Sequence, residues 1–388
     1  MVERKKIAIC LEFSIRLRGG VSILVETLAR GLSEKCDIVL VTDDVDLSGH
    51  PIMPMVSRHL RWDHLKITPR SARQLADELA ASGVQLAHFH LGGVFGWGNR
   101  RPGKCPALYL PRHGIAACST VHLVVHPLDG FCGPEKPLWF KLALFPMAWM
   151  TKLQVLRRLN CEIAVSRHDA EKLRRWYWPQ RGKFQQMYHS RFRADSQPHS
   201  TGPREPMILN VGHIAIRKGQ LDLVEAFIQI AGRHPEWKLC LAGDFQEKPL
   251  TERIRALAAA KGLSDRIQLL GPRDDAFQLM QRAGIYVQPS HFEALGLALQ
   301  EAMFYGCPSI GARVGGIPEL IEHEKTGLLV EPKNPAMLAQ TLELLISNPA
   351  LREQYGRAGA ASIIQKGMTE ERMFANHLEL YESILRRR

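Results

Sequence analysis

Short apolar runs alternate with segments of helical spacing along the whole chain, and this alternation constrains the fold more than any other feature. The run KKIAICLEF at 5–13 has the character of a strand, and apolar residues in 21–32 then recur every three or four positions. Similar strand-like runs are CDIVLVT (36–42), VQLAHFH (84–90), PALYLPRH (106–113), CEIAVS (161–166), PMILNVG (206–212), WKLCLAG (237–243), RIQLLG (266–271), GIYVQPS (284–290), CPSIGA (307–312) and GLLVEP (327–332). Such alternation is typical of parallel sheets covered by helices on both faces, so we predict an α/β chain with two Rossmann-like parallel sheets.

The length and one polar segment divide the chain into domains. At roughly 100 to 200 residues per domain, 388 residues suggest two of them. Residues 195–206, DSQPHSTGPREP, are rich in Pro, Ser and charge and have no periodicity, as expected of a linker. We predict an N-terminal domain over 1–202, a C-terminal domain over 203–366 and a C-terminal helix over 367–388. Two sheets in tandem imply a central cleft, and such clefts commonly hold ligands.

Composition and local motifs argue against several classes of protein. The eight cysteines are scattered without a C-x-x-C pair, which favours buried, reduced thiols and a cytoplasmic chain over a disulfide framework or a zinc site. The N-terminal run lacks a small-residue cleavage site, and no window holds about 18 to 20 uninterrupted apolar residues. We therefore expect neither a secretory signal nor a spanning helix. The first half also lacks the G-x-G-x-x-G fingerprint, which makes NAD a poor candidate.

The positive charge of the chain is concentrated in its first half. Residues 1–200 hold 29 Lys and Arg against 17 Asp and Glu, whereas residues 201–388 hold 22 of each kind. A one-sided basic surface indicates an anionic partner such as nucleic acid, phospholipid headgroups or a phosphorylated or acidic substrate. The alternative is a solvated surface without a partner.

One segment of the first half has an irregular mixture of aromatic, aliphatic and basic residues. It is PLWFKLALFPMAWMTKLQVLRR, residues 137–158. It could lie in a membrane interface, with its apolar side in lipid and its basic residues at phosphates, namely Lys141, Lys152, Arg157 and Arg158. Alternatively, it is a buried helix pair capped by exposed charges.

The stretch HFEALGLALQEAM at 291–303 places two glutamates in an apolar background. A strand ends just before it and a helix is expected to begin near Gly296, so Glu293 falls in the turn and Glu301 falls inside the helix. Helix N-terminal N–H groups after a parallel strand form an anion site, and glycine lets a phosphate approach. A carboxylate beside that phosphate should face a neutral group with hydroxyls, such as a sugar. The buried Glu301 needs hydrogen-bond donors, and the two hydroxyls of a ribose would serve.

Residues 206–332 resemble the donor domain of the retaining GT-B glycosyltransferases of family 4, also called glycosyl transferases group 1. The motifs that carry the resemblance are ILNVGH, IRKGQ, LAGD, LLGPRDD and SHFEALGLALQEAMFYGCPSIGARVGGIPELIEHEKTGLLVEP. In the first half, Gly19 and Gly20 match a glycine pair after the family's first strand, and His113 with Gly114 matches a histidine-glycine after a central strand. The resemblance is weak over 53–101. It implies the two-domain GT-B fold, whose final helix crosses back to the first domain.

The resemblance also implies a role for each matched residue. Glu301 would bind the ribose of a nucleotide sugar, Glu293 would bind the transferred sugar, and the cations of Arg217 and Lys218 would meet the diphosphate. Because fixed cations can replace a metal at the leaving group, we expect a metal-independent enzyme without a cofactor. The implied catalytic residues are His113, Glu293, Arg217 and Lys218. The implied donor-binding residues are Gly19, Gly20, Gly212, Arg217, Lys218, Gly243, Pro272, Arg273, Glu293, Ala294, Leu295, Gly296, Leu297 and Glu301.

Several of these roles have alternatives. The N–H of Gly20 would approach the diphosphate, or Gly20 belongs to an ordinary strand-to-helix turn. His113 would sit beside the reacting sugar, or it is structural. The family often has arginine where this chain has His213, so either Arg217 does that work or phosphate binding is weaker. The loop at Pro272 and Arg273 would contact the base mainly through its backbone, which does not reveal the base.

The sequence therefore predicts a retaining glycosyltransferase that uses a nucleotide sugar, with UDP or GDP as the expected carrier. The basic first half suggests a lipid-linked, phosphorylated or saccharide acceptor, as in envelope polysaccharide, lipopolysaccharide or glycolipid biosynthesis. We expect a cytoplasmic protein, peripheral on an anionic membrane, and no nucleic-acid partner because no recognition module for RNA is visible. The alternatives are a nucleotide-sugar epimerase of GT-B fold and a non-catalytic GT-B-like binding protein.

Overall fold

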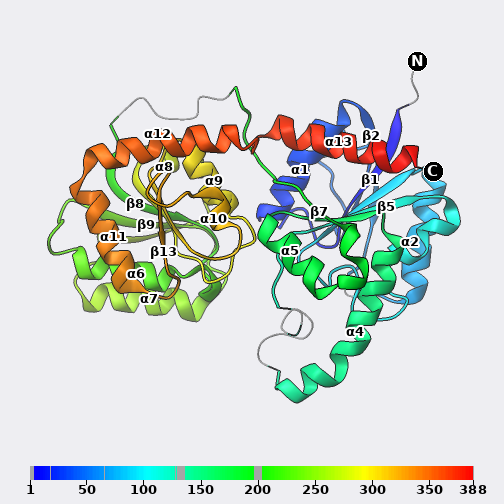
Figure 1. Cartoon of the computed structure of the whole chain (residues 1–388), viewed down its shortest axis with the longest axis horizontal. Coiled ribbons are helices and arrows are strands. Elements are labelled where there is room, and N and C mark those ends of the chain that lie inside the picture. The colour runs from blue at the N-terminus through cyan, green and yellow to red at the C-terminus, as the bar shows by residue number, and fades with distance from the viewer. Residues whose placement is uncertain are drawn as a thin grey trace. The chain divides into compact units, whose positions relative to one another are not determined.

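The structure is a computed structural model that describes residues 4–17, 19–64, 66–126, 128, 136–195 and 203–387. The chain forms two compact units, Met1–Arg191 with Glu370–Arg388 and Phe192–Thr369 (Figure 1). Each unit is built on one parallel sheet, as the sequence predicts. Cys132 and most of the predicted linker lie outside the described residues.

The first unit contains a seven-stranded sheet of order β3-β2-β1-β4-β5-β6-β7. Its strands are β1 (Lys5–Leu11), β2 (Cys36–Thr42), β3 (Arg58–Arg61), β4 (Leu86–Leu91), β5 (Ala116–Val121), β6 (Cys161–Ala164) and β7 (Phe184–Gln186). Its α-helices are α1 (Gly20–Ser33), α2 (Pro69–Ala81), α4 (Leu138–Arg158), α5 (Arg167–Trp176) and α13 (Glu370–Arg386). Short 3-10 helices are η1 (Met53–Met55), η2 (Pro106–Leu108), η3 (Leu110–His113) and η4 (Trp178–Lys183).

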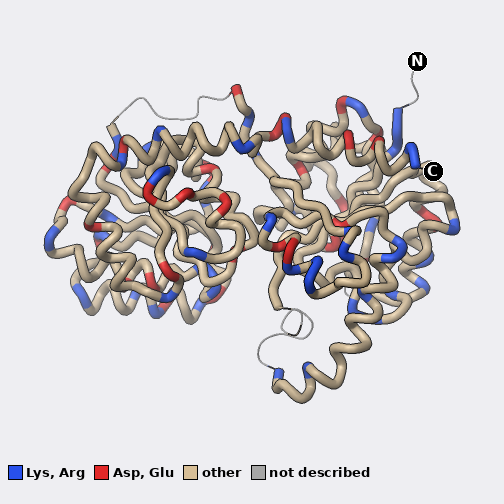
Figure 2. Tube along the Cα trace, in the orientation of Figure 1, with Lys and Arg blue, Asp and Glu red and all other residues tan. Residues whose placement is uncertain are grey.

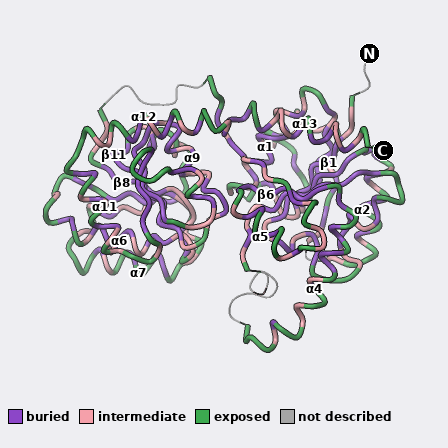
Figure 3. Tube along the Cα trace, in the orientation of Figure 1, coloured by how far each residue is buried: buried purple, intermediate pink, exposed green. Residues whose placement is uncertain are grey.

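The first sheet separates two hydrophobic cores. Along β1, Ala8 and Cys10 face a core that includes residues of α2 and α4. The alternate residues Ile7 and Ile9 face a second core that includes residues of α1 and α13. Both faces of the strand are therefore covered, which explains why it is a continuous apolar run without polar alternation. Figure 3 shows this buried centre of the unit.

The C-terminal helix α13 packs against α1 in the first unit. Gly31 of α1 makes close packing possible, because a Cβ there would lie 2.4 Å from the ring of Phe374. The adjacent Arg30 donates two hydrogen bonds of 2.9 Å to the carboxylate of Glu370, at the start of α13. A small residue and an ion pair thus fix the last helix on the first sheet.

The second unit contains a six-stranded sheet of order β10-β9-β8-β11-β12-β13. Its strands are β8 (Glu205–Val211), β9 (Lys238–Ala242), β10 (Ile267–Gly271), β11 (Ala283–Gln288), β12 (Ser309–Ala312) and β13 (Leu328–Val330). Its helices are η5 (Ile216–Lys218), α6 (Gln220–Ile230), α7 (Lys248–Ala260), α8 (Ala276–Arg282), α9 (Leu297–Phe304), α10 (Ile317–Leu320), α11 (Pro335–Ser347) and α12 (Pro349–Gln365).

The structure corrects one predicted strand and adds two. The run PALYLPRH forms η2 and η3, because Pro106 and Pro111 lack the N–H groups that a strand donates. The strand of this region is β5, which begins at Ala116. The short strands β3 and β7 were not predicted.

Two general features of the described residues bear on the exclusions made above. The seven described cysteines are buried and free of disulfides. Within the described part of the chain, no helix is both long enough and apolar enough to cross a bilayer.

Candidate active site

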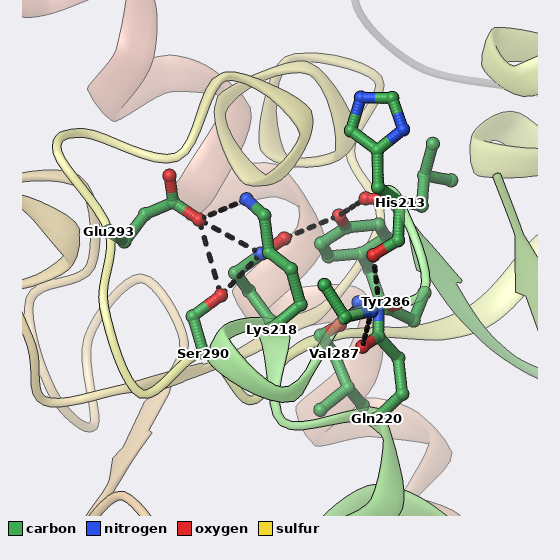
Figure 4. Close-up of polar contacts among 11 residues, drawn as sticks. His213, Lys218, Gln220, Tyr286, Val287, Ser290 and Glu293 are labelled. Atoms are coloured by element: carbon green, nitrogen blue, oxygen red, sulfur yellow. Dashed lines mark hydrogen bonds and ion pairs between the residues drawn. The ribbon is translucent and has the colours of Figure 1, made fainter. Parts of the chain in front are cut away.

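An ion pair between Lys218 and Glu293 lies at the carboxyl edge of the second sheet (Figure 4). Lys218 ends η5, which follows β8, and Glu293 lies in the loop that follows β11. Lys218 Nζ is 2.7 Å from Glu293 Oε2, and the two side chains are only 15% and 11% exposed. Ser290 Oγ and Gln288 Nε2 each donate to the same oxygen over 3.2 Å. In the part of the chain that the structure describes, all three of these donors meet Oε2.

The charge of Glu293 is set by competing influences. Burial alone would raise the pKa of this carboxyl group. The positive charges of Lys218 and Arg217, with hydrogen bonds from Lys218 and Ser290, outweigh burial and hold the pKa below its ordinary value. Glu293 is therefore an ionised acceptor at neutral pH.

The loops after β8 and β11 are joined through their backbones. The N–H groups of His291 and Phe292 donate to the carbonyl of Arg217 over 2.8 and 3.3 Å. Gly219 permits this approach, because it has φ +69° and a Cβ there would lie 2.0 Å from the carbonyl oxygen of Pro289. The glycine of the motif RKG thus positions the two cations next to the loop of Glu293.

A buried network of hydrogen bonds joins the segments at the same edge of the sheet (Figure 4). Gln220 Nε2 donates to the carbonyl of His213 over 2.9 Å and to Asn210 Oδ1 over 3.3 Å. Asn210 Nδ2 donates to the carbonyl of Val287, and Tyr286 OH donates to Gln288 Oε1, each over 2.8 Å. Sequence reasoning missed these residues, as it missed Ser290. For Asn210, Gln288 and Ser290 the signal was the placement of polar residues at or just after the ends of otherwise apolar strands, whereas Gln220 begins α6.

Two glycines let the loops after β8 and β9 approach each other. A Cβ on Gly243 would lie 2.1 Å from the carbonyl oxygen of Gly212, so a side chain at Gly243 would separate the loops. His213 follows Gly212. Burial lowers the pKa of His213, and the charges of Arg217 and Lys218 lower it further. His213 is therefore neutral at pH 7 and does not supply the charge of an arginine.

The predicted turn and helix around Gly296 are present. Gly296 has φ +99° and is the N-cap of α9, which begins at Leu297. Glu301 lies in this helix and is half-buried. The preceding Ala294 and Leu295 are buried, and a Cβ on Gly315 would lie 1.7 Å from the carbonyl oxygen of Glu293. The glycine pair of the motif GGIPELI thus packs against the loop of Glu293.

The predicted base loop forms a local ion pair of its own. Arg273 follows β10 and donates from Nε and Nη2 to the carboxylate of Asp275 over 2.7 and 2.6 Å. Both side chains are exposed, and none of the described contacts joins Arg273 or the adjacent Pro272 to the Lys218–Glu293 pair. Their role in binding a base stays a prediction.

The predicted residues of the first unit lie at opposite edges of its sheet. Gly19 and Gly20 follow β1 at the carboxyl edge and begin α1, as predicted. The placement of His113 after a strand was wrong: His113 ends η3 and precedes β5, at the amino edge, where its Nε2 is 2.9 Å from Asp77 Oδ1. The histidine that follows β5 at the carboxyl edge is His122, and its Nε2 lies 3.1 Å from Nδ1 of His90. The error arose because PALYLPRH resembled a strand.

The described residues include no group of three or more His, Cys, Asp or Glu side chains arranged to hold a metal ion. The charged groups at this site are instead the two cations after β8 and the carboxylate after β11. Such a set can bind an anionic group beside a hydroxylated one.

Comparison with known proteins identifies the family. The family model described as Glycosyltransferase Family 4 matches residues 18–189, and the model described as Glycosyl transferases group 1 matches residues 192–362. The alpha-D-kanosaminyltransferase of Streptomyces kanamyceticus is 32% identical over 157 residues, which are 40% of each chain. The chain spans about two-fifths of the length of the first curated relatives it matches.

Solved structures share the fold over nearly the whole chain. A glycosyltransferase from Rickettsia africae has a TM-score of 0.78 and 20% identity, with 98% of this chain and 99% of that chain covered. The Anabaena protein HepE in complex with UDP-glucose has a TM-score of 0.75 and 17% identity, with 97% and 99% covered. The predicted fold class is thus confirmed. The chain belongs to the glycosyltransferases of family 4, the glycosyl transferases group 1, and has their GT-B fold.

Proposed function

We propose that this glycosyltransferase transfers a hexosyl group from a UDP- or GDP-sugar to an acceptor and retains the anomeric configuration. The observation that carries the proposal is the Lys218–Glu293 pair, with Arg217 beside it, at the carboxyl edge of the second sheet. The carboxyl edge of a parallel sheet is where ligands bind in folds of this kind. The HepE structure was solved with UDP-glucose, which supports a nucleotide-sugar donor for the same fold.

The chemistry of the pair suits the two ends of the bond that breaks. Cleavage of a sugar–diphosphate bond develops negative charge on the leaving oxygen, and Arg217 and Lys218 supply fixed positive charge for it. Glu293 Oε1 can accept a hydroxyl of the transferred sugar, since the described donors all meet Oε2. Glu301, in the following helix, is proposed to hold the ribose. With these cations in place, the proposal needs no metal at the diphosphate.

Retention is proposed to proceed on one face of the sugar. A double displacement needs a carboxylate nucleophile beside the anomeric carbon, and the matched motifs of residues 1–200 contain none. In the proposed step, the acceptor oxygen bonds to the anomeric carbon on the face from which the diphosphate leaves. The leaving phosphate oxygen takes the proton of the acceptor hydroxyl, so no further base is required.

The acceptor is proposed to be lipid-linked, phosphorylated or a saccharide, as in envelope polysaccharide, lipopolysaccharide or glycolipid biosynthesis. The charge excess of residues 1–200 supports an anionic acceptor or surface. The corresponding location is the cytoplasmic side of a membrane, to which the enzyme would bind peripherally.

A thermal-shift screen tests the donor proposal. The full chain is mixed with UDP, GDP or ADP, or with a nucleotide sugar of each of them. A ligand that binds only the folded state raises the melting temperature of the chain. We expect one of UDP or GDP to raise it and ADP to have little effect. No shift with any nucleotide would contradict the proposal. Conversion of the bound nucleotide sugar into its epimer without an acceptor, followed separately by NMR, would favour the epimerase.

A further inference from the structure

Helix α4 turns one apolar face toward solvent, while other apolar residues of the helix, among them Ala148 and Leu156, pack in the core. In its first thirteen residues, Trp139, Leu142 and Met150 are 71%, 55% and 54% exposed. At 3.6 residues per turn, these positions fall on one face together with Ala143, Pro146 and Met147, all of which are also exposed. In Figure 1 this part of α4 extends away from the rest of the first unit, and Figure 3 shows it as largely exposed. A surface helix of a globular protein normally has polar residues on the face that it turns to solvent.

Two lysines of the same helix are buried. Lys141 and Lys152 are among the buried residues, and Lys152 forms an ion pair with the buried Glu162 of β6. These two lysines are therefore not available to phosphates, which corrects the expectation for them. The inward lysines also fix the rotation of the helix, so that its apolar stripe stays exposed.

The charged residues of α4 and of its immediate flanks are all basic. Residues 136–161 contain no Asp or Glu, and the exposed Lys136, Arg157 and Arg158 flank the stripe at its two ends. Figure 2 shows no acidic residue along α4. Trp149 Nε1 donates to the carbonyl of Trp176 over 2.9 Å and ties α4 to the segment that leads into η4.

The neighbouring η4 continues the same chemistry. Its Trp178 is 69% exposed and is followed by the exposed Arg181. Tryptophan, aliphatic side chains and arginine together, without carboxylates, are typical of segments that lie at the boundary between headgroups and acyl chains.

We propose that the exposed stripe of α4 docks the enzyme on the surface of an anionic phospholipid bilayer. Trp139, Leu142 and Met150 enter the boundary between headgroups and acyl chains, while Arg157 and Arg158 meet lipid phosphates. The exposed part of α4 spans roughly 20 Å at 1.5 Å per residue, which suits a helix lying in the interface. This inference deepens the proposed function, because a lipid-linked acceptor would be reached from that surface.

Vesicle sedimentation of the full chain tests the docking. Wild type is compared with Trp139→Ser/Leu142→Ser/Met150→Ser on vesicles of phosphatidylcholine alone and with phosphatidylglycerol. The matched control is Phe277→Ser/Leu344→Ser/Ile364→Ser, which removes three exposed apolar side chains from the second unit. We expect the α4 variant to bind anionic vesicles at least about tenfold more weakly, since tenfold corresponds to only ~1.4 kcal/mol. The control should bind like wild type.

Three further measurements distinguish the possible failures. Circular dichroism must show that both triple variants are folded, and the nucleotide thermal shift must be the same in all three proteins, which separates docking from donor binding. Arg157→Gln/Arg158→Gln should weaken binding to anionic vesicles and leave the weak binding to neutral vesicles unchanged. Equal vesicle binding by wild type and the α4 variant would overturn the proposal. The proposal would also be overturned if wild type formed a dimer that the α4 variant cannot form, because the stripe would then be a protein interface.

Discussion

At the scale of single residues, the site depends on groups that are costly to bury and are stabilised by one another. Glu293 stays ionised because the positive charge of Lys218 faces it. Lys218 is held in place because its Nζ donates a hydrogen bond to the same carboxylate. The two residues are 75 positions apart in the chain, so their contact was not visible in the sequence. The sequence did place both residues shortly after the end of a strand, because the apolar runs PMILNVG and GIYVQPS before them are recognisable as strands.

Replacing Lys218 should destabilise the chain in a pH-dependent way. Lys218→Met removes the positive charge and the hydrogen bond that offset the burial of Glu293. Keeping Glu293 ionised in the folded chain then costs free energy. We expect the free energy of unfolding at pH 7 to fall by roughly 1.5–3 kcal/mol, as for a lost hydrogen bond to a charged group. The wild-type carboxyl has a lowered pKa, so its stabilisation is present above about pH 4.5 and is lost as the pH falls. Urea unfolding should therefore give a smaller difference between variant and wild type at pH 4.

The control for this change is Arg273→Met, which breaks the exposed pair with Asp275. Its free energy of unfolding should change by no more than about 1 kcal/mol, because exposed pairs contribute little. A difference for Lys218→Met that is the same at pH 4 and pH 7 would contradict the account of Glu293.

A substitution at Gly219 should test the close approach of the two loops. Gly219→Ala and Gly262→Ala share nearly the same backbone strain, with φ +69° and +66°. Only at Gly219 does the added Cβ meet another atom, the carbonyl oxygen of Pro289 at 2.0 Å, whereas nothing lies within 4 Å at Gly262. We expect Gly219→Ala to lower the free energy of unfolding by roughly 1–3 kcal/mol more than Gly262→Ala. Equal losses in chemical denaturation would mean that the loops can separate freely.

At the scale of elements, the sequence predicted best those strands that are covered on both faces. The strands β1, β2 and β8 are continuous apolar runs because no side chain of their centre faces water. The edge strand β3, with sequence RHLR, was missed because its exposed arginines hide its single buried residue. For α4 the sequence left two alternatives, an apolar side in a membrane interface or a buried helix pair, because its apolar residues occur on more than one face.

The first sheet also contains a cluster of histidines, of which His122 is half-buried and the other four are buried. His88 and His90 lie on β4 with rings 4.3 Å apart, His122 follows β5, His189 follows β7 and His377 lies on α13. The rings of His189 and His377 are 5.6 Å apart, and His88 also contacts Tyr381 OH and Thr120 Oγ1. Burial lowers the pKa of all five, to about 3 for His122 and about 4 for His377. The folded chain therefore holds them neutral at pH 7.

The cluster should make the first unit sensitive to acid. These histidines have an ordinary pKa near 6.5 when unfolded, so the unfolded chain binds more protons than the folded chain below about pH 6.5. Stability should be unaffected above that pH and fall as the pH drops, by up to about 1.4 kcal/mol per pH unit for each histidine. Urea unfolding between pH 5 and 7 measures the slope. His377→Phe should reduce the slope, whereas the exposed His126→Gln should leave it unchanged; an unchanged slope for His377→Phe would contradict this account.

At the scale of the whole molecule, the sequence was sufficient for the fold class and the family, and less so for the site. Motifs such as IRKGQ and GGIPELI identify close backbone approaches that only glycine permits, and these are local properties of the sequence. The error at His113 came from one misassigned strand, which moved a histidine to the opposite edge of its sheet. The partners Ser290, Gln288 and Gln220 emerge only when separate strands align at one edge.

The most direct test of the central claim is turnover of the nucleotide sugar selected by thermal shift, with release of the nucleoside diphosphate measured for wild type, Glu293→Gln and the exposed control Glu252→Gln. Glu293→Gln keeps the size of the side chain but removes the charge that faces Lys218 and that, in the proposed reaction, meets the transferred sugar. We predict that it loses roughly 100-fold or more in turnover, the order of effect seen when an electrostatic contact to the reacting group is removed, while its fold is retained. Glu252→Gln should turn over like wild type. A folded Glu293→Gln with wild-type turnover would contradict the assignment of this site.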